Sequence, residues 1–519
     1  MVTEQRASGD PRPAPASAPR MAEPETAERD GPRPLDLVVD LCSALKAEGV
    51  DYCHWKSNEA IDRSASGDND LDLLVARRDI DRFEEILRRF RFKNAIQREI
   101  DRVPGVYHAY ALDETAGRLV HVHAHYQLVL GDDMTKNYRL PIEEAYLASS
   151  SEGEIFRVPS PDFELVVFVI RMMLKHETWD ATATLQGSLS GSERRELIDL
   201  SSHADLANVR AFVEAHLPYV GPALWYRSLL SIRGDLGRVE RMETARRLQR
   251  ALAGCARRPD VVDTPLKIWR RGKIWTRRHV FHRESPRKGL ASGGAMVAFV
   301  GGDGAGKSTA VDEISRWLAN DLRSSSFHLG KPRRGAVSTT AQAAWEMASR
   351  LRSTDVSGEQ MLAASSPDEE AGFRATARLV WEYMTARDRY RDYVRARRAA
   401  SNGSLVVCDR FPLPQITLMD GAAGTKMLDA DGRLVSLLAA RERHYYARIA
   451  YPDVLIVLRV DPDMAVQRKA GEEDEAFVRP RSEEIWRLDW SGTPAIVIDA
   501  GRPKEDVHRE IKSIIWAEL

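Results

Sequence analysis

The stretch FVGGDGAGKSTAVDEISRWL (residues 299–318) passes from an apolar run through four glycines to a lysine, two hydroxyl residues and an amphipathic pattern. Gly301, Gly306, Lys307 and Ser308 match the spacing G-x-x-x-x-G-K-S/T of a phosphate-binding loop. The context fits as well, because such a loop follows an apolar strand and precedes a helix. The stretch therefore predicts a strand, a loop that holds nucleotide phosphates, and a helix, in that order.

The residue types of this loop suit the binding of a triphosphate. Glycines let backbone N–H groups turn inward toward an anion, and the start of a helix near Lys307 adds the positive end of its dipole. We expect the Lys307 amine to reach the β and γ phosphates of ATP, and the Ser308 hydroxyl to bind Mg²⁺. Thr309 is expected either to lie near the α phosphate or to start the helix. The expected nucleotide-binding residues are Gly301, Asp303, Gly304, Ala305, Gly306, Lys307, Ser308 and Thr309.

Strand-like apolar runs alternate with helical patterns from Met296 onward. This alternation predicts an α/β domain with three layers, in which a parallel sheet lies between helices. Asp409 and Arg410 follow the run SLVVC, so they are expected at the carboxyl end of a buried strand, where open α/β sheets bind ligands. A carboxylate there can hold water on Mg²⁺, and a guanidinium can grip an acceptor phosphate. Ser308 and Asp409 are thus the expected metal ligands of this half.

Three segments of this half resemble thymidylate kinases and related nucleoside monophosphate kinases. They are GGDGAGKST (301–309), TARDRYRDYVRARRAASNGSLVVCDRF (385–411) and VLIVLRVDPDMAVQRK (454–469). The resemblance covers residues 296–519 and implies a kinase that uses ATP and Mg²⁺ to move the γ-phosphate to a nucleotide or another small acceptor. It also implies a functional arginine on the helix within 385–411, for which Arg387 and Arg389 are both candidates.

Phosphoryl transfer also requires positive charge on the migrating group. The phosphate loop has no arginine between Gly301 and Gly306, so the charge must come from elsewhere. The resemblance places a mobile lid at EEDEAFVRPRSEE (472–484), just after VQRK (466–469). Each cation of these two segments is either a catalytic group or a solvated surface charge, and Lys469 is one of them. The expected catalytic residues are Lys307, Asp409, Arg410, Arg468, Arg479 and Arg481.

The resemblance leaves the acceptor open. Thymidylate kinases seat thymine with an Arg-Glu-Pro-Gly-like turn and a Ser/Ala-Tyr-Gln run, whereas this chain has HLGKPRRG (328–335) and PLPQITLMDGAAG (412–424). Lys331, Arg333 and Arg334 could bind a phosphorylated acceptor. A nucleoside monophosphate is therefore one expected small-molecule partner among others.

A second motif, HWKSNEAIDRSASGDNDLDLLV (54–75), lies in the first half of the chain. Asp70 and Asp72 are one residue apart on an expected strand, so their carboxylates point the same way and can share a divalent metal ion. The segment resembles the nucleotidyltransferase superfamily, with Trp-Lys-Ser in place of its Gly-Ser. The resemblance implies that the turn at Lys56 and Ser57 faces the phosphates of a nucleotide.

The resemblance is incomplete at the third acidic position. His121 stands where the superfamily usually carries another carboxylate, and His123 and His125 follow it in LVHVHAHYQL (119–128). Three alternating histidines on one strand face form either an unusual metal site or a set of hydrogen-bonded imidazoles. Asp70 and Asp72 are accordingly either metal ligands, members of a degenerate fold, or a surface acidic turn.

The motifs and composition predict four regions. Residues 1–34, rich in Pro, Ala and charge, are expected to be disordered; 35–254 form an α+β domain of nucleotidyltransferase type; 255–294 are a basic linker; 295–519 form the kinase-like domain. The linker has eleven lysines or arginines against three acids between positions 255 and 288. It is either a connecting helix packed by Trp269 and Trp275 against one domain or a docking surface for an anionic polymer or membrane. GLASGG (289–294) is expected to be a flexible joint.

Composition restricts the partners. The 519 residues include 76 lysines and arginines and 77 acids, so no overall field favours nucleic acid, which is not an expected partner. The four cysteines are widely spaced and predict no disulfide framework or zinc scaffold. No apolar run of about 18 residues predicts a transmembrane segment. We therefore expect a soluble cytoplasmic protein, for which a homodimer is one assembly.

Two other functions remain open from the sequence. In one, the N-terminal half transfers a nucleotidyl group and the phosphate loop regulates it. In the other, both halves bind nucleotides without turnover and act as a sensor. An intact phosphate-loop motif and several arginines in the expected lid favour catalysis over sensing, because simple binding needs no transition-state charge.

Overall fold

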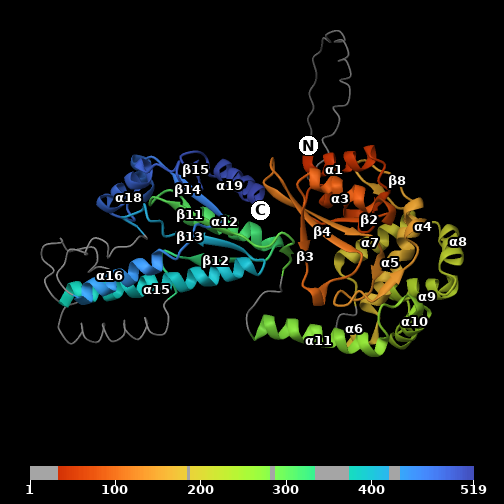
Figure 1. Cartoon of the computed structure of the whole chain (residues 1–519). Coiled ribbons are helices and arrows are strands. Elements are labelled where there is room, and N and C mark those ends of the chain that lie inside the picture. The colour runs from red at the N-terminus through yellow and green to blue at the C-terminus, as the bar shows by residue number, and fades with distance from the viewer. Residues whose placement is uncertain (1–32, 184–187, 281–286, 334–372, 420–432) are drawn as a thin grey trace, which may run out of the picture.

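The computed structural model describes residues 33–183, 188–280, 287–333, 373–419 and 433–519. It contains two main sheets, one in each half of the chain, with helices packed against both (Figure 1). The N-terminal sheet is mixed and the C-terminal sheet is parallel, which confirms the predicted α/β class. The expected disordered tail lies outside these residues, apart from its last two positions.

The N-terminal half is built from short strands followed by a helical bundle. Its elements in chain order are α1 (Asp36–Ala47), β1 (Tyr52–His54), η1 (Asn58–Ala60), α2 (Ile61–Ala65), β2 (Leu71–Val75), η2 (Arg77–Asp79), α3 (Ile80–Arg89), β3 (Lys93–Ile96), η3 (Glu99–Asp101), β4 (Val106–Asp113), β5 (Arg118–His125), β6 (Leu128–Leu130), β7 (Tyr138–Leu140), α4 (Glu143–Ala148), β8 (Ser151–Glu152), β9 (Arg157–Val158), α5 (Pro161–His176), α6 (Trp179–Ala183), α7 (Gly191–His203), α8 (Leu206–His216), α9 (Gly221–Arg233), α10 (Arg238–Ala251), η4 (Ala253–Cys255) and α11 (Asp260–His279).

Alternation along the strands gives the N-terminal sheet, in the order β1-β2-β5-β4-β3-β10, two different faces. Leu73 and Val122 belong to the face that packs on α1 and α3. Asp72 and His123, one residue out of step with them, project from the other face. Leu74 on that second face joins a cluster built around α5, which is buried along nearly its whole length. The apolar run at 165–174 is therefore a core helix of a bundle.

The C-terminal half alternates strands and helices as predicted. Its elements are β10 (Gly289–Leu290), β11 (Met296–Gly301), α12 (Lys307–Asp321), β12 (Ser324–His328), α15 (Phe373–Ser401), β13 (Leu405–Asp409), α16 (Arg433–Tyr446), β14 (Val454–Arg459), α17 (Pro462–Lys469), α18 (Glu475–Arg487), β15 (Ala495–Asp499) and α19 (Lys504–Glu518). All but β10 belong to the C-terminal sheet and its helical layers, and the strand order is β12-β13-β11-β14-β15.

The central strand β11 is buried on both sides. Val297 and Phe299 pack with α12 and α19, while Ala298 and Val300 pack with α15. Both neighbouring strands, β13 and β14, run parallel to it. Parallel sheets are covered on both faces, which explains why β11 reads as a continuous apolar run. The carboxyl ends of three adjacent strands consequently meet at the edge where the phosphate loop begins.

The two halves share one apolar cluster and one sheet edge. Tyr110 and Leu112 of β4 lie in the same buried cluster as Ile511 and Trp516 of α19. The segment expected to be a flexible joint is instead paired, because β10 adds antiparallel to β3 at the edge of the N-terminal sheet. The expectation of a flexible joint was wrong for β10, because this strand is paired with β3 and Leu290 is buried in the shared cluster.

The basic helix α11 packs differently from the prediction. Trp269 and Trp275 are 50% and 59% exposed, so one of the two alternatives, a helix held against a domain by its tryptophans, was wrong. Buried cations hold it instead: Lys267 pairs with Asp263 at 2.9 Å, and Arg271 pairs with Asp132 and Asp180. Opposite charges that are buried together can replace an apolar contact only when each has its partner.

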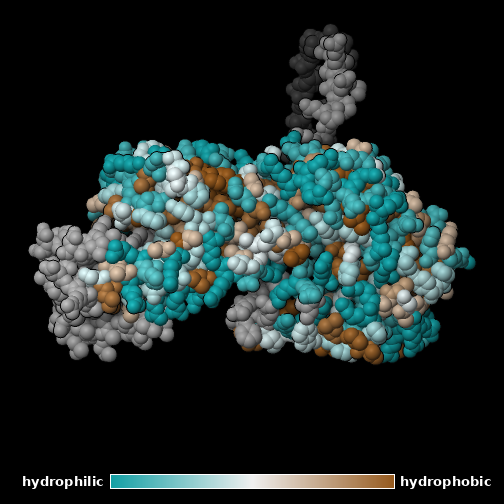
Figure 2. Space-filling view, in the orientation of Figure 1, coloured by the Kyte–Doolittle hydropathy of each residue, from teal (hydrophilic) through white to brown (hydrophobic). Residues whose placement is uncertain are grey.

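Apolar side chains remain on the outside of α11. Figure 2 shows brown surface along the lower side of the N-terminal half, where α11 lies in Figure 1. Its exposed aliphatic residues include Val261, Val262 and Ile268. Within the described ranges, no helix combines the length and apolar character needed to cross a membrane.

Gly294 lies between β10 and β11 in the chain and packs closely on the segment that joins α15 to β13. A Cβ atom there would lie 2.3 Å from the carbonyl oxygen of Ser404 and 2.5 Å from that of Ala400. We expect Gly294→Ala to lower the free energy of unfolding by about 1–3 kcal/mol, because backbone must move to admit the methyl group. Urea unfolding of the full chain measures this change.

Gly272 provides the matched control, since a Cβ there meets no atom within 4 Å. It lies inside α11, so Gly272→Ala should leave stability unchanged or raise it by up to about 1 kcal/mol. Equal effects of the two substitutions would contradict the packing described for Gly294.

Candidate functional site

The phosphate loop connects β11 to α12 and packs tightly on its own protein. A Cβ atom on Gly301 would lie 2.5 Å from the Leu458 carbonyl oxygen of β14, and one on Gly304 would lie 2.7 Å from the Ala465 carbonyl oxygen of α17. Gly304 and Gly306 both have positive φ, at +77° and +82°. The glycines at 301 and 304 are therefore needed for close backbone approach, in addition to any room they leave for phosphates.

Gly306 differs from the other loop glycines. A Cβ atom there would meet nothing within 4 Å, so this residue faces open space and is glycine because of its backbone conformation. It directly precedes α12, whose first residue is Lys307. Ala305 is buried, while Ser308 and Thr309 are exposed in the first turn of α12. The exposed side of the loop thus combines a helix start with two hydroxyl groups.

The Lys307 amine lies over this loop. Its Nζ donates to the Gly302 carbonyl oxygen at 2.6 Å, and the side chain is only 7% exposed. The amine is therefore held beside the backbone that the motif assigns to phosphates. Its reach to the β and γ phosphates of ATP stays a prediction.

Three cationic side chains act on Asp303 in the middle of the loop. Arg481 Nη1 lies 2.8 Å from Asp303 Oδ2, and Arg410 Nη2 lies 3.5 Å from Oδ1. Burial raises the pKa of Asp303. The hydrogen bond from Arg481 and the charges of Lys307, Arg481 and Arg410 lower this pKa by more than burial raises it, so the net shift is downward. The carboxyl is thus ionised and joins α18 and the end of β13 to the phosphate loop.

Asp409 and Arg410 lie at the end of β13, directly beside β11. Asp409 is opposite Phe299 in the ladder, and its Oδ2 lies 3.6 Å from His328 Nε2. The other oxygen, Oδ1, is buried and has no hydrogen-bond partner in the part of the chain that the structure describes. Arg410 has a φ of +62°, which is uncommon for a residue with a side chain. A buried carboxylate oxygen without a donor fits a ligand position for Mg²⁺ or its water.

The cations of residues 466–484, which include the predicted lid, divide into two groups. Arg468 reaches the loop, because its guanidinium donates to the Gly304 carbonyl oxygen at 3.4 Å. Arg479 pairs with Asp463 at 2.6 Å and with Glu475 at 2.8 Å, and Lys469 pairs with Glu472 at 2.7 Å. Of the predicted lid residues, the structure therefore brings Arg468 and Arg481 to the phosphate loop and keeps Arg479 among acids of α17 and α18.

The two candidate helix arginines also differ. Arg389 is buried on α15, and its guanidinium donates to the carbonyl oxygens of Leu329 at 2.6 Å and Gly330 at 3.0 Å. It therefore holds the segment after β12, which the sequence marked as an acceptor loop. No described hydrogen bond connects Arg387 to that segment. Lys331 and Arg333 belong to it, while Arg334 lies outside the described residues.

The second group of polar residues lies on the N-terminal sheet. Asp70 Oδ1 lies 2.7 Å from His121 Nδ1, and Asp72 Oδ1 lies 2.8 Å from His123 Nδ1. Lys56 Nζ also contacts Asp72 Oδ1, at 2.9 Å. Burial raises the pKa of Asp72, yet Lys56 and His123 together bring it well below the usual range. Each aspartate of the motif is thus engaged by its own histidine.

The turn expected to face a nucleotide is occupied by a carboxylate. The Ser57 N–H donates to Glu196 Oε1 at 3.1 Å, and Asn58 Nδ2 donates to Glu164 Oε2 at 2.8 Å. Arg171 completes the group with a 2.6 Å bond to Glu196. This buried network was missed in the sequence, although the arginine that interrupts the apolar run at 165–174 was the available signal.

Comparisons with known proteins find similarity among solved structures alone. No protein-family model matches the chain, and no curated protein matches it in sequence. Among solved structures, a thymidylate kinase from Candida albicans is similar with a TM-score of 0.28 and 16% sequence identity. The match covers 43% of this chain and 92% of that one.

Glu164 makes stability depend on pH. Burial raises its pKa to about 8, against a hydrogen bond from Asn58 that lowers it. Because the folded-state pKa lies above the unfolded value of about 4.3, the folded protein keeps a proton that the unfolded chain loses as pH rises. The contribution of Glu164 to the free energy of unfolding is full below about pH 4. It falls by about 1.4 kcal/mol per pH unit as the pH rises to the folded-state pKa.

Glu164→Gln should remove this slope and raise the free energy of unfolding at pH 7. Chemical unfolding between pH 5 and pH 8 measures it, with Glu214→Gln on the exposed side of α8 as the control. The difference in stability between the wild type and the Gln variant isolates Glu164 from the other titrating groups, and a Gln variant with the wild-type slope would show that Glu164 is ionised in the fold.

Proposed function

We propose that residues 296–519 are an ATP- and Mg²⁺-dependent phosphotransferase that moves the γ-phosphate of ATP to a small acceptor, such as a nucleoside monophosphate. The supporting observation is the convergence of Lys307, Arg410 and Arg481 on Asp303 at the phosphate loop. A site that only binds a nucleotide does not need several cations at one point, whereas transfer of a phosphoryl group does.

Each group has a role in such a transfer. The Lys307 amine exchanges its bond to the Gly302 carbonyl oxygen for the β and γ phosphates, and the N–H groups at the start of α12 face the same anion. Arg410 and Arg481 exchange Asp303 for the acceptor and the migrating group, respectively. An acceptor oxygen then bonds to the γ phosphorus while the bond to the β–γ bridging oxygen breaks, and ADP leaves.

Ser308 and Asp409 are the residues that would hold Mg²⁺. Ser308 is exposed in the first turn of α12, and Asp409 has a buried oxygen that receives no donor within the described ranges. The ion would supply charge neutralisation on the β and γ phosphates.

The acceptor side is supported by the end of β12. Arg389 holds the backbone at Leu329 and Gly330, directly before Lys331 and Arg333, and β12 ends opposite Asp409 of β13. These cations suit an acceptor that already carries a phosphate. ATP consumption by the full chain, screened over nucleoside monophosphates, sugars and sugar phosphates, identifies the acceptor class.

Nucleotidyl transfer by the N-terminal half has less support. It needs a metal ion shared by Asp70 and Asp72 and a free amide at the preceding turn. In the structure these carboxylates bond to different histidines, and Glu196 occupies the Ser57 amide. Release of pyrophosphate that depends on Asp70 and Asp72 would restore this function.

The Lys307→Ala variant tests the phosphotransferase proposal. We expect acceptor-dependent ATP turnover to fall by about 100-fold or more, the effect of removing one group that stabilises developing charge. Coupled ADP release measures the rate, and circular dichroism checks the fold. Arg316→Ala, on the exposed side of the same helix, should keep wild-type turnover. Turnover that survives in Lys307→Ala would refute the proposal.

Arg481→Gln tests the charge assigned to the migrating group. The substitution should lower kcat by about 100- to 1000-fold while the affinity for ATP changes much less, because the charge matters most in the transition state. Arg487→Gln is the matched control, since Arg487 lies on the same helix and is 75% exposed. An unchanged kcat in Arg481→Gln would assign this arginine to the fold alone.

A further inference from the structure

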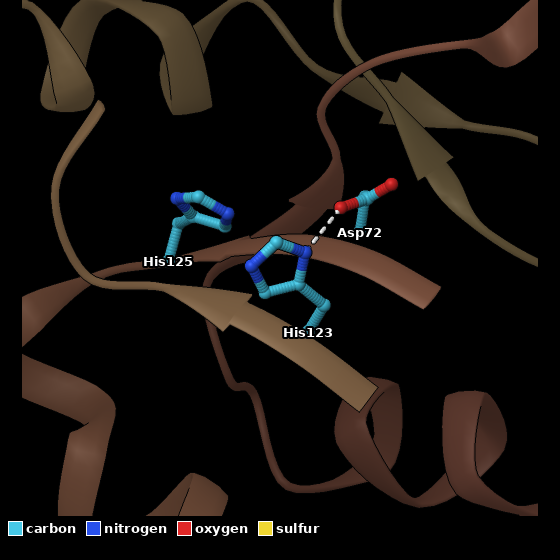
Figure 3. Close-up of side chains that lie close together, drawn as sticks. All are labelled: Asp72, His123 and His125. Carbon is cyan, nitrogen blue, oxygen red and sulfur yellow. Dashed lines mark hydrogen bonds and ion pairs between the residues drawn. The ribbon is translucent and has the colours of Figure 1, made fainter. Parts of the chain in front are cut away.

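The register of two parallel strands brings three potential metal ligands together in the N-terminal half. Asp72 on β2 is opposite His123 on β5, and Leu74 is opposite His125. Side chains alternate along a strand, so His123 and His125 project from the same face as Asp72. Figure 3 shows the two imidazoles side by side on β5, with the carboxylate of β2 beside His123.

The donor atoms of these residues lie close together. One ligand atom from each of Asp72, His123 and His125 lies within 4.8 Å of the others. The closest pair, Asp72 Oδ1 and His123 Nδ1, is 2.8 Å apart, and the two imidazole centroids are separated by 4.5 Å. Two donors on one zinc ion lie at most about 4.2 Å apart, so modest side-chain rotation brings all three within reach of an ion.

His125 is the independent indication of a ligand. The residue is only 4% exposed, and neither of its ring nitrogens has a hydrogen-bond partner in the described part of the chain. Buried polar groups are nearly always paired, because an unpaired one costs about 1–3 kcal/mol. Trp55 packs against the ring at a centroid distance of 5.0 Å, so the imidazole lies under apolar cover. A coordinated metal ion would satisfy one of these nitrogens.

We propose that Asp72, His123 and His125 form a binding site for a divalent transition-metal ion such as Zn²⁺. The site goes beyond the phosphotransferase function, since none of its residues belongs to the phosphate-loop half. Two imidazoles and one carboxylate suit Zn²⁺, Fe²⁺ or Co²⁺, whereas Mg²⁺ prefers an all-oxygen shell.

Three protein ligands leave at least one coordination position open. Structural zinc sites are usually closed by four protein ligands, and sites with three hold a water molecule or a substrate as well. Lys56, whose amine lies 2.9 Å from Asp72 Oδ1, is the cation that the metal ion must join or displace at that carboxylate. The proposed site is therefore of the exchangeable kind.

A neighbouring set of residues connects this site to the other half. Asp70 contacts His121 Nδ1. The other ring nitrogen of His121, Nε2, lies 3.1 Å from His108 Nδ1 and 3.5 Å from the Lys288 amine. Lys288 directly precedes β10, the strand that joins the halves. Asp70 is thus engaged outside the proposed ligand set, and its removal should leave metal binding largely intact.

Metal binding to the full chain, freed of any affinity tag, tests the proposal. Protein stripped with a chelator is titrated with Zn²⁺ by calorimetry, and bound metal is counted by mass spectrometry after dialysis. We expect one ion per chain, and a visible absorption band typical of low-coordinate Co²⁺ when cobalt replaces zinc. His125→Gln and Asp72→Asn should each weaken binding by about 100-fold or more, since a direct ligand matters more than the residues behind it.

His203→Gln is the control, because His203 is an exposed histidine on α7 that should not affect binding. Circular dichroism establishes that each variant is folded, and Asp72→Asn keeps the shape of the side chain if His125→Gln does not fold. The proposal is overturned if the wild-type chain retains no Zn²⁺ after dialysis. It is equally overturned if both ligand variants bind as the wild type does, or if only Asp70→Asn abolishes binding.

Discussion

The central position of β11 fixes the start of the phosphate loop in the C-terminal half. This strand is buried on both faces and lies between two parallel neighbours, so its end cannot shift without disturbing both layers of helices. The phosphate loop begins at the end of β11. Asp409, the last residue of the adjacent strand β13, is opposite Phe299 of β11. The packing therefore fixes the carboxyl edge of the sheet, which is the edge where open α/β sheets bind ligands.

The loop is then fixed from outside by contacts that only glycine permits. Gly302 and Gly304 touch α18 and α17 so closely that any Cβ atom would overlap Ser482 or Ala465. Ser482 also donates to the Asp303 carbonyl oxygen at 3.1 Å. Movement of α18 toward or away from the loop would therefore change the loop backbone and the position of Arg481 together. The position of one helix thus determines both the backbone of this loop and the charge beside Asp303.

The N-terminal half has its polar groups at a comparable place for a different reason. A row of aspartates and histidines lies on one face of a mixed sheet, between the α5 bundle on one side and the C-terminal half on the other. The α5 bundle and the C-terminal half remove these aspartates and histidines from water. Burial is the largest influence on the pKa of His123 and lowers it to about 4, although the nearby Asp72 raises it. Neutral imidazoles beside an ionised carboxylate are the protonation states that bind metal ions.

Much of the C-terminal half could be predicted from the sequence because its signals are local. The loop motif, the alternating pattern and the ends of β11 and β13 each depend on neighbouring residues. The remaining features depend on contacts across long stretches of chain. Arg481 meets Asp303 only because close packing brings α18 to the loop.

The N-terminal half and the linker show the same limit. The partner of Asp72 depends on the register between β2 and β5, which no short motif reports. The orientation of α11 depends on buried aspartates far from it in sequence, so the tryptophans that suggested packing are on the outside instead. Charge pairs over such separations leave no periodic signal.

The shared apolar cluster has a consequence for how this protein is made. Tyr110 and Leu112 emerge from the ribosome early, but Ile511 and Trp516, which cover them, are synthesised far later. During translation the apolar side chains of β4 therefore stay exposed until α19 has been synthesised. Nascent chains with exposed apolar surface associate with chaperones or with one another. Loss of α19 would therefore uncover apolar side chains of the N-terminal sheet as well as those of the C-terminal half.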